Sequence, residues 1–399
     1  MTDHPVTLPT ERAAGCPFDP AAGLGRLREE QPLRRMTYPD GHVGWLATGY
    51  PEVRAILADP RFSSRYELLH LPFPGSPEGP LPPAPPGDMT GMDAPEHTRF
   101  RRLLMGRFTV RRMRLLAERV EEITAERLDS MERQGPGVDL VPVFAQPIPA
   151  LMICELLGVP YADQETFQRQ AATLMSMDVP MEERGAAMTG LMEYMHALVL
   201  GKRAEPTDDL LSDLAQDSDL TVEELTGLGA FLLAAGLDTT ANMLAHGTFA
   251  LLSNPAQAAA LRAEPEPAGQ AVEELMRYLS IAHTTVKAAL EDVELAGQVI
   301  GAGESVTLAL DAANRDPRRF DDPDALDLHR AATGHLAFGH GIHQCLGQQL
   351  ARVEMTVALP ALLTRFPTLR LAVDPKDVPL RTDMNIYGVH SLPVAWDEA

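Results

Sequence analysis

Apolar residues recur at every third or fourth position through much of the chain, which is the spacing of helices that bury one face. Because this period extends over most of the central part of the sequence, we expect a mainly α protein. The predicted helices span residues 96–113, 113–132, 143–157, 163–177, 181–200, 221–252 and 255–262.

Strand-like segments are few, and most lie late in the chain. Residues 45–62 form an apolar strand pattern followed by an amphipathic helix pattern. Residues 71–87 hold eight prolines, too many for a helix or an inner strand, so we expect a long loop there. No repeat and no linker rich in glycine or serine divides the chain, which favours one large domain with a minor β region. The later predicted strands span residues 285–290, 293–300, 305–309 and 368–373.

Composition narrows the class of protein further. The chain has 34 basic and 56 acidic side chains, and its net charge of -22 repels nucleic acid. Three cysteines in 399 residues are too few for a secreted disulfide scaffold, so we expect a reducing cytoplasm. The first residues lack the apolar core of a signal peptide. The longest apolar stretch, residues 228–237, falls short of the ~20 residues of a membrane span, so no membrane anchor is expected.

The most informative segment is a glycine-rich loop that leads through Cys345 into a helical pattern. At a helix entrance, free backbone N–H groups and the helix dipole stabilise a thiolate, which is the form of cysteine that binds metals. Gly339, Gly341 and Gly347 can adopt positive φ angles and would let a flat cofactor approach the backbone. A lone cysteine is more often a small buried hydrophobe, but these surroundings favour a ligand.

The loop, Phe338 to Arg352, resembles the haem-binding signature of cytochromes P450, Phe-Gly-x-Gly-x-His-x-Cys-x-Gly-x-x-Leu-Ala-Arg, at every specified position. The resemblance extends over residues 45–396 and is closest to actinomycete hydroxylases of macrolides, vitamin D and similar bulky apolar substrates. It implies a single large cytochrome P450 fold with haem b as cofactor. It also implies that Cys345 is the thiolate ligand of the haem iron and that Phe338, His343 and Gly347 contact the haem.

Two polar residues, Asp238 and Thr239, stand among aliphatic residues in the predicted helix at 221–252. One interpretation is structural: Thr239 bonds to the carbonyl four residues earlier and Asp238 has a salt partner. The resemblance instead makes this the helix that crosses over the iron, with Asp238 and Thr239 as catalytic residues that manage protons.

His97 and Arg101 are four residues apart at the start of a predicted helix. They could be a solvated stripe, but the resemblance assigns both to the haem propionates. Lys287 stands where relatives often carry arginine, and its ammonium could pair with a propionate without the bidentate fork of arginine.

Glu274 and Arg277, three residues apart on one helix face, could be an ordinary surface pair. The resemblance makes them a structural pair. Relatives add an arginine from a later segment, where Ala325 stands in this chain, so we expect Arg277 to use backbone carbonyls instead.

The resemblance implies a monooxygenase that hydroxylates or epoxidises a bulky hydrophobic small molecule, such as a macrolide, terpenoid or steroid, with O2. No Gly-x-Gly-x-x-Gly fingerprint follows a strand, so electrons are expected from a ferredoxin and its NAD(P)H-dependent reductase. A non-catalytic haem-thiolate gas or redox sensor and a peroxide-driven enzyme are the alternatives.

We expect a monomer. We expect its substrate pocket to be lined by the proline-rich loop and by residues 175–195, 281–285 and 384–387. A basic patch that attracts an acidic ferredoxin could be formed by Arg99, Arg102, Arg107, Arg111 and Arg112. The sequence supports a solvated helix face equally well.

Overall fold

The structure of the protein is a computed structural model. The structure describes residues 4–12, 15–73, 76, 79–107, 110–163, 165–166, 169–170, 173, 180–264, 268–382 and 386–397. Most of the predicted helix at 163–177 and parts of the proline-rich loop lie outside these residues, as do residues 175–179, 384 and 385 of the expected substrate lining.

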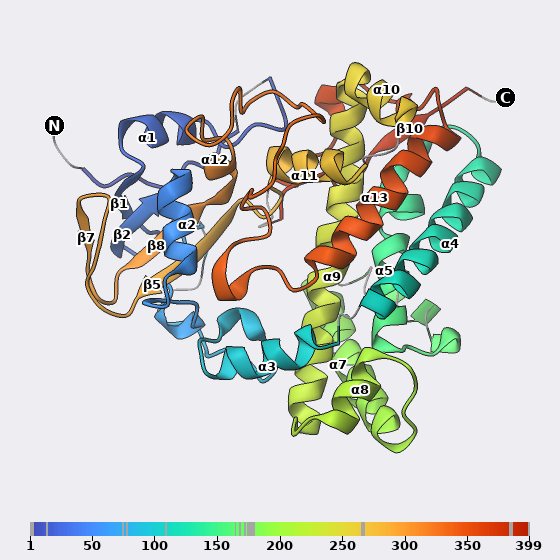
Figure 1. The fold of residues 1–399 in the computed structure, drawn as a ribbon, viewed down its shortest axis with the longest axis horizontal. Helices are drawn as coiled ribbons and strands as arrows, with labels where there is room; N and C mark the ends of the chain where they lie inside the picture. Colours follow the sequence, from blue (N-terminus) through green and yellow to red (C-terminus); the bar gives the residue numbers. More distant parts are fainter. Residues whose placement is uncertain are drawn as a thin grey trace.

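The molecule has a helical part and a smaller part built around a sheet, which occupy opposite sides of Figure 1. The predicted mainly α architecture with a minor β region is therefore confirmed. The main helices are α3 (Glu96–Met105), α4 (Val110–Gln134), α5 (Pro147–Leu157), α7 (Met181–Ala204), α8 (Leu210–Asp217), α9 (Val222–Ser253), α10 (Pro255–Ala263), α11 (Ala268–Leu279) and α13 (Gln348–Arg365).

Two predicted helix boundaries are wrong. The helix expected at 96–113 ends at Met105, because the chain leaves the helix after Gly106 and starts α4 at Val110. The segment at 143–157 begins with a π-helical turn, Val141–Ala145, which precedes α5. Periodicity could not distinguish these irregular turns from regular helix.

The main sheet has five strands in the order β1, β2, β8, β5, β3. Strand β8 is its centre, parallel to β2 and antiparallel to β5, so that Lys287 of β5 lies opposite Val306. Helices α1 (Leu24–Glu30), α2 (Tyr50–Ala58) and α12 (Leu310–Asn314) lie beside the sheet (Figure 1). The strands are β1 (Leu33–Thr37), β2 (Val43–Ala47), β3 (Phe62–Ser63), β5 (Thr284–Ala289) and β8 (Ser305–Ala309).

The other predicted strands are shorter than expected. The segment at 293–300 is a hairpin of β6 (Val293–Leu295) and β7 (Gln298–Ile300), because Ala296 and Gly297 both take positive φ angles and turn the chain back. The segment at 368–373 contributes only β9 (Arg370–Leu371), which joins β4 (Val138–Asp139) and β10 (Pro393–Ala395) in a small sheet.

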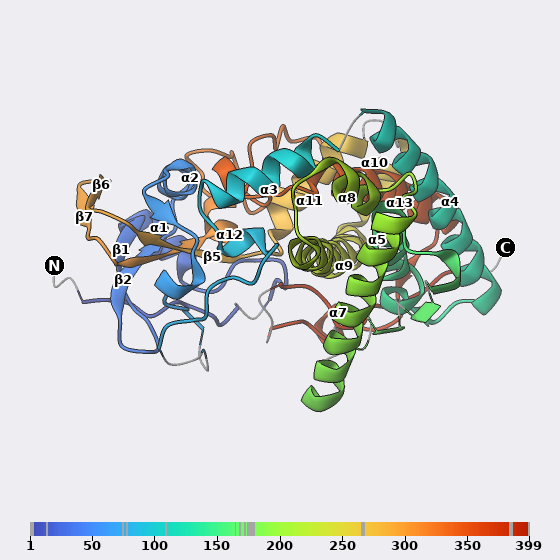
Figure 2. The same ribbon diagram turned by 90° about the horizontal axis from the view of Figure 1, so that it is seen from below.

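Helix α9 is the central helix of the core. Thr221 and Glu224 form a reciprocal capping box that fixes its start. Figure 2 shows α9 nearly end-on, with α5, α7 and α8 packed around it. By length and composition α9 could cross a membrane, but 61% of its apolar window is buried within the protein. The surrounding helices therefore account for its apolar composition.

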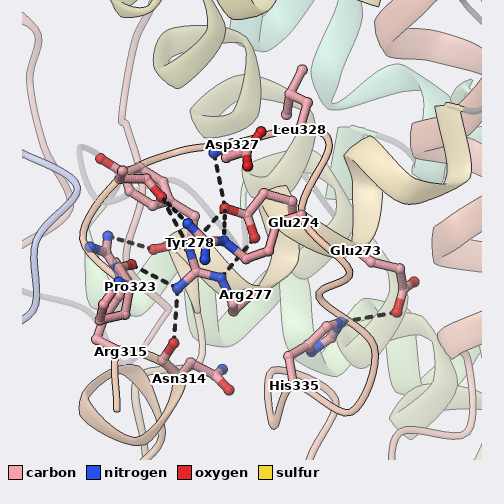
Figure 3. Close-up of polar contacts among 12 residues, drawn as sticks. Glu273, Glu274, Arg277, Tyr278, Asn314, Arg315, Pro323, Asp327, Leu328 and His335 are labelled. Carbon is pink, nitrogen blue, oxygen red and sulfur yellow. Dashed lines mark hydrogen bonds and ion pairs between the residues drawn. The ribbon is translucent and has the colours of Figure 1, made fainter. Parts of the chain in front are cut away.

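A buried charge cluster joins α11 to the segment that precedes the cysteine loop (Figure 3). Glu274 and Arg277 are fully buried, and Arg277 Nε and Nη2 donate to the two Glu274 carboxylate oxygens at 2.7 and 2.8 Å. Arg277 Nη1 also donates to the carbonyl oxygens of Asn314 and Pro323. The expected use of backbone carbonyls is thus confirmed.

The expectation that a second arginine is missing from this cluster is wrong. Arg330 Nε donates to Glu274 Oε1 at 3.1 Å, so the guanidinium comes from five residues beyond Ala325. The neighbouring Glu273 accepts from Arg352 Nε of α13 at 2.5 Å and lies 3.3 Å from His335 Nε2. Helix α11 therefore contacts the chain both before the cysteine loop, at His335, and after it, at Arg352.

We predict that Arg277→Leu lowers the free energy of unfolding by about 3–5 kcal/mol, because it leaves a buried carboxylate without its main partner. Urea unfolding of the holoprotein measures this loss. The matched control is Arg365→Leu, which removes an exposed arginine paired with Asp129 and Glu132 and should change stability little. Equal losses in the two variants would contradict the importance of the buried cluster.

Candidate functional site

Cys345 lies between the short turn Gly341–His343 and the start of α13. Its N–H donates to the Phe338 carbonyl at 2.8 Å. Gly339 and Gly341 have φ angles of 68° and 75°, and a Cβ on Gly341 would lie 2.3 Å from the Leu57 carbonyl oxygen. The predicted positive φ is therefore confirmed at these two glycines. Gly347 has an ordinary φ of -79°, and nothing lies within 4 Å of where its Cβ would be.

The charge state of Cys345 depends on opposing influences. Burial is the largest and raises the pKa of the thiol, whereas hydrogen bonds from the backbone N–H groups of Gly347 and Gln348 lower it. The nearby charges of Arg101 and Arg352 also lower the pKa. On balance the pKa of Cys345 is raised, although the start of α13 acts in the direction that the sequence predicted, toward the thiolate.

The cysteine loop forms one wall of a cavity of about 470 Å³. Thr239 and Thr240 of α9 line another part of the wall, and Met89, Ile153 and Phe231 make it mainly apolar. Every residue predicted to bind the cofactor lines this one cavity: His97, Arg101, Lys287, Phe338, His343, Cys345 and Gly347.

Four of these residues form a group that we call the cationic cradle: His97, Arg101, Lys287 and His343. The two imidazole rings are 4.1 Å apart between centroids. Burial, Arg101 and Lys287 lower the pKa of His97 to about 4, and the same causes together with His97 lower that of His343 to about 3. Both imidazoles are therefore neutral near pH 7 and able to donate an N–H.

The cradle fits an anionic group. Among the residues that the structure describes, His97 Nδ1 and His343 Nε2 are buried without a hydrogen-bond partner. Lys287 Nζ donates to Ser64 Oγ, and burial lowers the pKa of this ammonium to about 8 although the charge of Asp93 opposes that shift. The cations of Lys287 and Arg101 and the unpartnered imidazole nitrogens beside a mainly apolar cavity fit a haem whose propionates these residues would hold, with Cys345 as its ligand.

The acid and the alcohol of α9 point in different directions. Thr239 lines the cavity and its hydroxyl donates to the Ala235 carbonyl at 2.8 Å. Asp238 is instead held by Arg381, whose Nη1 and Nη2 donate to the carboxylate at 2.8 and 3.0 Å. These are the contacts of the structural interpretation, and the Thr239 hydroxyl still retains lone pairs that can accept from water in the cavity.

A titratable cavity residue was missed from the sequence. Glu354 of α13 lines the cavity and is buried, and burial raises the pKa of this carboxyl to about 8 while a hydrogen bond with Thr240 lowers it. Its position on the apolar face of a helical pattern, nine residues after Cys345, could have indicated it. Only the three-dimensional contact with α9 shows that it reaches the cavity.

Part of the expected substrate lining lies on the cavity. Ile281, Ala282, Thr284 and Thr285 line it. The described residues of the proline-rich loop, of 175–195 and of 384–387 do not, although Met89 and Thr90, just after the loop, do.

Comparison with known proteins identifies the relatives of this chain. The family model for cytochrome P450 matches residues 181–394. Cytochrome P450 105C1 of a Streptomyces species is 49% identical over 394 residues, which are 98% of this chain and 99% of that protein. Vitamin D3 dihydroxylase of Streptomyces griseolus is 42% identical over 401 residues, covering 99% of this chain and 98% of that protein.

A solved structure gives the same answer for the fold. The crystal structure of CYP105P1 in complex with filipin I superposes with a TM-score of 0.91 at 40% identity, covering 99% of this chain and 100% of that one. The resemblance predicted from the cysteine loop is confirmed by these relatives.

We predict that Lys287→Ala speeds haem loss about tenfold or more, because a hydrogen bond to a charged group contributes about 1.5–3 kcal/mol. Lys287→Arg should keep most of the retention, since it keeps the cation. Transfer of haem to excess apomyoglobin measures the rate, and Lys376→Ala, at an exposed lysine paired with Asp374, is the control. Equal haem loss from the Ala and Arg variants would remove Lys287 from the cradle.

Proposed function

Because the chain belongs to the cytochrome P450 family of monooxygenases, we propose that it hydroxylates or epoxidises a bulky hydrophobic small molecule of secondary metabolism, using O2 and electrons from a ferredoxin. The observation that carries this proposal is the single cavity that joins Cys345, the cationic cradle and an apolar wall. Haem b, held by Cys345 and the cradle, would supply the activation of O2 there. Family membership favours catalysis over the non-catalytic gas or redox sensor.

The apolar wall supports a macrolide, terpenoid or steroid as substrate. Ile153, Leu156, Phe231 and Leu232 come from the two helices α5 and α9, and Met89 adds a flexible side chain that adapts to irregular shapes. Hydroxyl side chains are interspersed in the lining, and they would orient a substrate through its polar groups rather than bind it by charge: Ser64, Thr90, Thr239, Thr240, Thr284 and Thr285. The names of the relatives, which include a vitamin D3 dihydroxylase, support the same class.

The acid and the alcohol of α9 take the proton-handling roles. Thr239 would hold a water molecule in the cavity through the lone pairs of its hydroxyl. Asp238 lies one residue away on the outer side of the helix, where Arg381 holds its carboxylate. We assign Asp238 to the supply of protons and Thr239 to their placement.

A ferredoxin would dock near the cysteine loop, at part of the predicted basic patch. Arg99 and Arg112 are paired with acids, Arg99 with Glu224 and Arg112 with Asp213, so their charges are compensated. Arg102 and Arg111 are exposed, and neither has a carboxylate within ion-pair distance in the described part of the chain. These two arginines would attract an acidic ferredoxin to a protein of net charge -22.

We also propose that the protein is a monomer and acts in the cytoplasm.

The direct test is reconstitution of the holoprotein with a ferredoxin, its reductase, NADPH and ¹⁸O2 against a panel of macrolides, terpenoids and steroids. We expect members of one class to shift the Soret band on binding and to yield a product with one ¹⁸O atom. Hydrogen peroxide without ferredoxin tests the peroxide-driven alternative. Product oxygen that comes from water, or product formed with peroxide but not with ferredoxin, NADPH and O2, would contradict the proposal.

We predict that Thr239→Ala continues to consume NADPH and O2 but diverts much of both to hydrogen peroxide. The reason is that the variant lacks the hydroxyl that would bind water in the cavity and so place the protons. The ratio of product to NADPH should fall several-fold. Thr226→Val is the control, since its buried hydroxyl on the same helix donates to the Val222 carbonyl and does not line the cavity. Full coupling in Thr239→Ala would show that this hydroxyl does not place protons.

A further inference from the structure

Helix α9 carries a second polar feature, on the side away from the cavity. Asp238, Asn242 and His246 are spaced four residues apart in a helix that is otherwise largely apolar. Asn242 Nδ2 donates to the Asp238 carbonyl at 3.1 Å and lies 3.3 Å from its Oδ1. Asn242 is 3% exposed and His246 is fully buried. We call these three residues the polar row.

A single segment near the C-terminus covers the polar row, residues 379–382 and 386–390. Arg381 pairs with Asp238, and a Cβ on Gly388 would lie only 2.1 Å from Asn242 Oδ1. The Tyr387 ring stands at 88° to the His246 ring, with centroids 5.3 Å apart. Because one segment touches all three residues, they share one face of α9.

The two ring nitrogens of His246 have no hydrogen-bond partner within the described residues. Its neighbours are the aromatic rings of Phe18, Phe249 and Tyr387, which offer no strong acceptor. Leaving a buried polar group unsatisfied costs about 1–3 kcal/mol. Native proteins usually satisfy such groups with internal water that makes two to four hydrogen bonds.

His246 is also neutral. Burial, with a smaller effect from the charge of Arg12, lowers the pKa of this imidazole to about 3. A neutral imidazole has one N–H donor and one acceptor nitrogen, so it can sit within a chain of hydrogen bonds between water molecules. An uncharged side chain that can both donate and accept a hydrogen bond suits a chain of water molecules better than an ion pair.

The far end of the polar row meets the N-terminal segment of the chain. The Tyr387 hydroxyl donates to the Pro17 carbonyl at 2.7 Å, and the Arg12 guanidinium lies 3.4 Å from the centre of the Tyr387 ring. Arg12 is half-buried, so solvent reaches this end. The other end is Asp238, which faces the row rather than the cavity.

We propose that the polar row holds ordered water and is the route by which protons pass from solvent to Asp238, with His246 as its positioning residue. The proposal rests on the proposed function, in which substrate RH, O2, two electrons and two protons give ROH and water. Asp238 then takes up protons behind α9 while Thr239 places them in the cavity.

The test compares His246→Leu with the wild-type holoprotein in oxygen-driven turnover supported by ferredoxin and NADPH. We expect a fall of about tenfold, below the 10²–10⁴-fold that a direct proton donor contributes, and a larger solvent isotope effect. Turnover supported by hydrogen peroxide should stay unchanged, because peroxide brings its own protons. His246→Gln, which keeps a donor and an acceptor, should restore most of the oxygen-driven rate.

A matched control is Thr248→Val, which removes another buried polar group from α9, one whose hydroxyl donates to the Leu244 carbonyl at 2.7 Å. It should leave both rates unchanged. An independent readout is a high-resolution crystal structure, in which water should bond to a ring nitrogen of His246 and be absent from His246→Leu. Thermal stability of His246→Leu should not fall, since the unsatisfied nitrogens are removed with the ring.

The outcomes separate the two proposals. A dry imidazole in the crystal, or a His246→Leu variant with a normal oxygen-driven rate and isotope effect, overturns the polar row and leaves the proposed function standing. A wild-type holoprotein that oxidises none of the panel with either oxidant overturns the proposed function and the route that rests on it. Equal losses of oxygen-driven and peroxide-driven turnover in His246→Leu also overturn the route, because they indicate general damage.

Discussion

The position of the cysteine loop depends on two neighbouring carboxylates of α11. Glu274, fully buried with Arg277 and joined by Arg330, fixes the segment from Asn314 to Arg330. Glu273 binds Arg352 of α13 and lies against His335, just before the loop. Although burial raises it, the nearby His335 and the hydrogen bonds from Arg352 lower the pKa of Glu273 to about 2, so this carboxylate stays charged. Both sides of Cys345 are thus tied to one helix.

Helix α9 separates two environments, a mainly apolar cavity and the polar row. Its inner side is apolar apart from the threonine hydroxyls and faces the cavity, whereas Asp238 and Asn242 lie on the covered outer side. A residue and its neighbour in the chain point about 100° apart on a helix. For that reason Asp238 and Thr239 can serve opposite sides while remaining adjacent in sequence.

The sequence indicated the features that local pattern or a dense motif encodes. The periodicity predicted α9 almost to the residue, and the resemblance carried by the cysteine loop and by the segments around His97, Arg101 and Lys287 predicted seven residues that all line one cavity. Features that depend on distant partners were not predictable. Arg330 could not be recognised as the partner of Glu274. The two residues are far apart in sequence, and the path of the irregular segment before Arg330 decides which side chain reaches the carboxylate. Likewise, Glu354 and His246 look like ordinary positions in apolar helices until their neighbours from other elements are known.

The cationic cradle also bears on the stability of the fold. Lys287 and His97 are buried; the Lys287 ammonium bonds to Ser64 Oγ, whereas His97 Nδ1 has no hydrogen-bond partner among the described residues. Burying such groups opposes folding unless they are fully paired. If haem faces them as proposed and binds only the folded chain, each tenfold increase in the ratio of free haem to its dissociation constant would add about 1.4 kcal/mol to the stability of the fold. The side chains that would hold the cofactor are then also the ones through which the cofactor would stabilise the chain.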